Sequence, residues 1–143
     1  MTLDRVAWLV GVALLVMVLN IVASVLYMVI YGHLINPGHP PQFYQEHVKV
    51  AAPYCSIVAG IPLMFLAGYW VAGWWGPSLA VQAALTIWAA YALVDLAVLL
   101  TAGMNGKIAA IFAISFLTKL LAVYGGALAA AQSGASRVPA GAG

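Results

Sequence analysis

The amino-acid sequence predicts an all-α integral membrane bundle of four transmembrane helices, with a structured interfacial loop between the first two. Hydrophobic residues make up 66% of the 143 residues and charged residues only 6%, against about 25% charged residues in a typical soluble domain. Four apolar segments are also long enough to cross a bilayer, which takes about 20 helical residues. Five basic and three acidic side chains could not cover the surface of a water-soluble fold of this size.

The first apolar segment, residues 6–31, is longer than the roughly 7–15 apolar residues of a signal peptide, so we expect a retained first span. The polar residues 32–52 that follow predict the interfacial loop. In it, Asn36 to Gly38 form a turn signature, and Pro40 and Pro41 cannot lie inside a helix. Residues 42–50 regain a helical pattern, which fits either the start of the second span or a short interfacial helix.

The remaining spans are predicted at residues 53–75, 79–101 and 107–131. Pro53 suits the first turn of a helix, and Pro62 predicts a kink in the second span. The short turn at residues 76–78 makes the second and third spans antiparallel neighbours. The tail, residues 132–143, is small and polar and is expected to be disordered.

Four spans place both termini on one side of the membrane, called side A, and the histidine-bearing loop on the other, side B. Basic residues do not decide the orientation, because Arg5 and Arg137 lie on side A and Lys49 and Lys107 on side B. We expect a multi-pass protein of the cytoplasmic membrane of a prokaryote. Since Arg5 precedes the first span, we expect both termini in the cytoplasm, and insertion in both orientations stays open.

Asp95 and Lys119 are the two charged residues within the predicted spans. Each costs about 2.5–3.5 kcal/mol at a helix centre, so neither should face lipid. At about 1.5 Å per residue, Lys119 lies roughly 8 Å deeper than Asp95, and its side chain leans towards Asp95. These positions predict a direct or water-bridged ion pair. Further polar side chains in the same half of the membrane complete a predicted intramembrane cluster: Asn20, Ser24, Tyr27, Tyr91, Ser115 and Thr118.

This cluster indicates a polar interior or shallow vestibule that opens towards side B. It is consistent with the binding or passage of a small polar solute or ion, with Asp95 as the titratable site and Lys119 as its counter-charge. The pair can equally be structural and fix the helix register. Two other functions stay open: a non-catalytic assembly subunit, and an enzyme acting on a lipid or quinone headgroup through the loop.

The interfacial loop carries the side chains with the most acid–base and metal-binding potential: His33, His39, Glu46 and His47. Their spacing does not match a metal site, because neighbouring Glu46 and His47 diverge by about 100° on a helix. We therefore predict neither a metal nor a cofactor. On one continuous helix Cys55 would lie about 12 Å from His47, so we expect a buried thiol rather than a nucleophile.

A helix-packing set is predicted on the second span. Its small side chains recur every four residues and permit the close approach of another helix. The set consists of Ala52, Ser56, Gly60 and Pro62. The expected partners are the lipid bilayer and, through this stripe, a second copy of the chain or a larger membrane complex. The formal charge of +2 is too small and dispersed to indicate a nucleic-acid partner.

Overall fold

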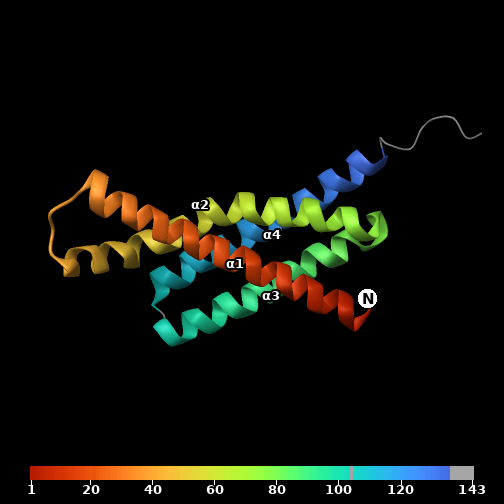
Figure 1. Ribbon diagram of the computed structural model, residues 1–143. Coiled ribbons are helices and arrows are strands. Elements are labelled where there is room, and N and C mark those ends of the chain that lie inside the picture. The colour runs from red at the N-terminus through yellow and green to blue at the C-terminus, as the bar shows by residue number, and fades with distance from the viewer. Residues whose placement is uncertain (104, 136–143) are drawn as a thin grey trace, which may run out of the picture.

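The computed structural model describes residues 1–103 and 105–135 and confirms an all-α bundle of four long, apolar helices (Figure 1). Helix α1 spans Leu3–Ile30 and continues into a π-helical turn, η1, at Tyr31–Ile35. The other helices are α2 (Pro41–Trp75), α3 (Pro77–Ala102) and α4 (Gly106–Ala135). By length and composition, all four can cross a membrane.

The ends of the bundle divide as the sequence predicts. The N-terminus, the α2–α3 turn and the end of α4 lie at one end of the molecule, side A (Figure 1). The α1–α2 connection and the start of α4 lie at the other end, side B. Tryptophans gather at side A, where Trp8 and Trp74 meet edge to face and the Arg5 guanidinium lies 5.6 Å from the Trp75 ring centroid. Such rings favour the membrane–water interface.

The α1–α2 connection differs from the predicted loop at residues 32–52. The chain reverses between Asn36 and Pro40, and α2 already begins at Pro41. Proline fits the first helical turn, where its missing N–H is not needed. Pro53 therefore lies inside α2 instead of starting it, and Pro62 is also internal. Membrane helices tolerate such prolines because neighbouring groups satisfy the freed carbonyls.

The C-terminal boundary of α4 also differs from the prediction, and this helix too is longer than expected. Helix α4 continues through residues 132–135, which were expected to belong to a disordered tail. The rest of that predicted tail, residues 136–143, lies outside the described residues.

The core of the bundle fills the half nearer side A. Its largest fully buried apolar side chains come from all four helices: Leu9, Met64, Val71, Ile87 and Val123. Helices α2 and α4 share the largest interface. They approach so closely that a Cβ atom added at Gly68 would meet the carbonyl oxygen of Val123, and one added at Gly126 would meet that of Phe65.

We predict that Gly126→Ala lowers the free energy of unfolding by about 1–3 kcal/mol, the usual effect of overpacking a filled interface. The added methyl group would press on the backbone of α2 at Phe65 and Tyr69, which cannot rotate away. Unfolding of the purified protein by dodecyl sulfate, followed by circular dichroism, measures the change. The matched control is Gly125→Ala, whose methyl group would meet only the Phe65 ring, at 3.9 Å. Equal stability of the two variants would contradict this packing.

Candidate functional site: a buried charge pair beneath a membrane cavity

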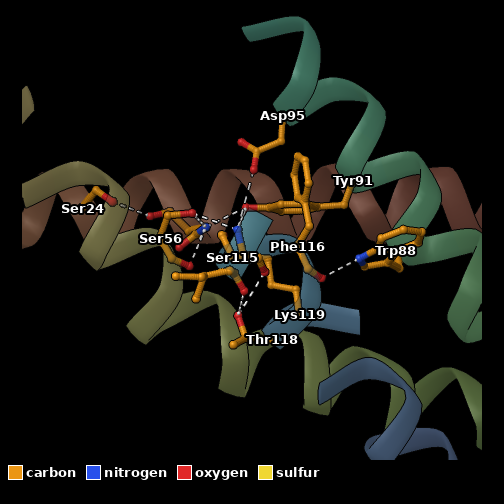
Figure 2. A network of polar contacts seen from close by, with 11 residues as sticks. Ser24, Ser56, Trp88, Tyr91, Asp95, Ser115, Phe116, Thr118 and Lys119 are labelled. Atoms are coloured by element: carbon orange, nitrogen blue, oxygen red, sulfur yellow. Dashed lines mark hydrogen bonds and ion pairs between the residues drawn. The ribbon is translucent and has the colours of Figure 1, made fainter. Parts of the chain in front are cut away.

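The structure brings Asp95 and Lys119 together inside the bundle. Lys119 Nζ lies 3.7 Å from Asp95 Oδ2, and the lysine side chain is fully buried whereas the aspartate side chain is 17% exposed. The long stem of Lys119 spans the axial offset expected from the sequence. Figure 2 shows the carboxylate of Asp95, on α3, pointing towards the ammonium group on α4.

Two hydroxyl groups also hold the Lys119 ammonium. Nζ donates to Ser56 Oγ at 2.9 Å and to Tyr91 OH at 3.0 Å, and it lies 4.4 Å from the Tyr91 ring centroid (Figure 2). The glycine at position 60 makes room for the stem, because a Cβ there would lie 2.5 Å from Lys119 Cε. Ser56 and Gly60 therefore face α4 inside the bundle, and Ser56 is a polar partner that sequence reasoning placed only among packing residues.

Asn20 links α1 to the same group of side chains, which we call the polar floor: Asn20, Ser56, Tyr91, Asp95 and Lys119. Its Nδ2 donates to Tyr91 OH at 2.7 Å and to Ser56 Oγ at 3.1 Å. The polar floor thus takes residues from all four helices. Networks of this kind specify a single arrangement of the helices that carry them.

Two acceptor atoms of the polar floor are almost inaccessible and unpaired among the described residues. Asn20 Oδ1 and Asp95 Oδ2 are buried and have no hydrogen-bond partner among the described residues. Lys119 already directs hydrogen bonds to Ser56 and Tyr91, and its 3.7 Å separation from Asp95 is too long for a further one. Unsatisfied buried acceptors are uncommon and call for a physical explanation.

The other predicted cluster residues are placed around the polar floor. Ser24 and Thr118 donate to backbone carbonyls of their own helices, and Ser115 is buried with no hydrogen-bond partner in the described part of the chain. Tyr27 turns away from the polar floor and meets His47, with 3.2 Å between the hydroxyl and Nε2. Trp88, one turn from Tyr91, instead bonds the Phe116 carbonyl at 3.0 Å.

A cavity of about 850 Å³ extends from the polar floor to the side-B end of the bundle. All four helices line it, and Asn20, Ser56, Tyr91 and Asp95 contribute to its inner end. Its mouth includes His33, on the π-helical turn. Most of the wall between is apolar, and Ile21, Val25 and Val98 on it are more than half exposed. The space is therefore an open apolar groove, and its lining differs from the polar interior that was expected.

The histidine-bearing segment does not form one reactive cluster. His39 stacks on Phe43 and bonds Asn36, whereas His47 stacks on Tyr31 with 3.9 Å between ring centroids. Glu46 is exposed. Within residues 1–103 and 105–135, no three His, Cys, Asp or Glu side chains are placed to share a metal ion.

Cys55 and His47 both line a second, smaller cavity of about 500 Å³, beside Tyr27. No hydrogen bond between the thiol and the imidazole occurs among the described contacts. The arrangement therefore lacks the nucleophile–base contact that activates a cysteine.

We predict that Asp95→Asn and Lys119→Met each lower the free energy of unfolding by about 3 kcal/mol, because each leaves one buried charge unpaired. The double variant should lose clearly less than the two single losses together, since it removes both charges. Unfolding by dodecyl sulfate measures all three. Lys107→Met is the matched control, because Lys107 lies in the first turn of α4, outside the polar floor. If the double variant lost as much free energy of unfolding as the two single variants together, coupling between the charges would be excluded.

Comparisons with protein-family models, with curated proteins and with solved structures gave no match for this chain. The chemistry of the site is accordingly inferred from its own contacts, burial and charges.

Proposed function

We propose that the protein binds a small molecule with a polar group in the membrane, and that the molecule reaches the polar floor through the side-B cavity. The observation that carries this proposal is the coincidence of the two features. The cavity is lined by Asn20 and by Asp95, whose side chain is 17% exposed and is the charged group on the cavity wall among the described residues. Since an ionised carboxylate only accepts hydrogen bonds, a ligand that supplies a donor would pair with it.

Binding is better supported than passage of a solute or ion across the membrane. Beyond the polar floor, the side-A half is filled by packed side chains, including Leu9, Met64 and Ile87, all with 0% exposure. Transport would require this half to open, and protein cores of this density do not admit a solute without rearrangement. A binding protein needs only the cavity on side B.

Roles in membrane assembly or in catalysis receive less support from the geometry. Ser56 and Gly60, expected to present a packing stripe to a partner helix, contact Lys119 within the same chain. Of the loop histidines, His39 and His47 stack on neighbouring aromatic rings, and His33 contacts the Val29 carbonyl oxygen. The binding proposal, by contrast, uses both the cavity and the partly exposed carboxylate of Asp95.

We expect the gently purified protein to carry a small-molecule adduct that native mass spectrometry detects. Ala52→Phe should remove the adduct, because Ala52 lines the cavity and the introduced phenyl ring would occupy it. Asp95→Asn should weaken its retention at least tenfold, roughly the effect of losing one charge-assisted hydrogen bond.

The control for that experiment is Asp4→Asn. Asp4 lies at the side-A start of α1, far along the helix from the cavity, and should leave the adduct unchanged. Absence of an adduct from the parent protein, or its equal retention by Ala52→Phe, would overturn the proposed binding function.

A further inference from the structure

We infer that the cavity selects uncharged amphipathic molecules whose headgroup donates hydrogen bonds, such as fatty alcohols and monoacylglycerols. This inference rests on the proposed function and names the ligand class for the same cavity. Three properties of the site carry it: its charge balance, the partly exposed carboxylate of Asp95 and its apolar wall.

The charge balance disfavours an ionic ligand. The polar floor contains one carboxylate and one ammonium group, 3.7 Å apart, and these offset each other. No other Asp, Glu, Lys or Arg among the described residues lines the cavity. An ionic headgroup would therefore introduce a net charge near the middle of the membrane, where an unbalanced charge costs about 2.5–3.5 kcal/mol.

The acceptors disfavour a ligand that can only accept hydrogen bonds. Asp95 lines the cavity, and its carboxylate only accepts hydrogen bonds, whereas the sealed ammonium of Lys119 already bonds Ser56 and Tyr91. A hydroxyl headgroup donates the hydrogen bond that this carboxylate can accept. A quinone, ketone or simple ester brings no donor.

The wall of the cavity fits an alkyl chain. Along α1 it runs from Met17 to Val29, a rise of about 18 Å, and the side chains between them are mainly aliphatic. Contributions from the other helices are also apolar, among them Val48, Val98 and Phe112. The volume of about 850 Å³ falls within the usual range of small-molecule sites, roughly 300–1,000 Å³.

Equilibrium binding to the full chain in lipid nanodiscs tests the ligand class, with empty nanodiscs subtracted for partitioning. Four radiolabelled probes share one chain length: monodecanoylglycerol, decylammonium, decanoate and methyl decanoate. For the parent protein we expect saturable binding of monodecanoylglycerol, at least tenfold tighter than that of the other three. Glycerol alone should not bind, because it lacks the chain that the wall accommodates.

Charge variants provide a gain of binding that a purely structural pair would not produce. Asp95→Asn leaves the ammonium unbalanced and should raise the affinity for decanoate at least tenfold. Lys119→Met leaves the carboxylate unbalanced and should do the same for decylammonium. Asp4→Asn should change neither, and Ala52→Phe should remove binding of every probe.

The outcomes separate the inference from the proposed function. Should a charged probe or methyl decanoate bind the parent most tightly, and Ala52→Phe remove that binding, the cavity binds ligands but the class named here is wrong. Unaltered charge preference in folded Asp95→Asn and Lys119→Met also overturns the charge-balance argument. Should no probe bind above empty nanodiscs and no adduct accompany the purified protein, both the inference and the proposed function fail.

Discussion

Burial of the Lys119 ammonium is the constraint on which the arrangement of the helices depends. An unpaired charge at this depth is unfavourable, so three acceptors from α2 and α3 surround Nζ. The stem reaches them only because position 60 is glycine. Asn20 then bonds two of the same partners and ties α1 to them. The contacts around the Lys119 side chain thereby fix the rotation of all four helices about their axes.

The sequence was sufficient to predict the four helices and the Asp95–Lys119 contact, because both depend only on positions along the helix axis. Apolar length fixes the spans, and the rise per residue fixes the depth of each charge. The start of α2 was predicted too late. Both Pro41 and Pro53 satisfy the rule for a first helical turn, and only the tertiary structure shows that Pro53 lies inside the helix.

The contact between Ser56 and Lys119 and the apolar wall of the cavity were not predicted, for a different reason. Whether a serine faces lipid, a partner or a buried lysine depends on how α2 is rotated against α4, which periodicity alone does not determine. The cavity depends on how the helices diverge. Both α1 and α4 pack on α2 and α3, and the space towards side B stays open between them. The intramembrane cluster predicted from the sequence includes residues at the inner end of the cavity, but it did not indicate the aliphatic wall.

The charge pair is asymmetric in its burial. Lys119 is sealed, whereas the Asp95 side chain is 17% exposed and lines the cavity. Asp95 Oδ2, 3.7 Å from Lys119 Nζ, is the buried carboxylate oxygen, so the exposure belongs to the rest of the side chain. Burying an ion pair costs desolvation of both charges, and here only the lysine is desolvated completely. Lys119 therefore balances the charge inside the bundle, and Asp95 is the member of the pair that borders the cavity.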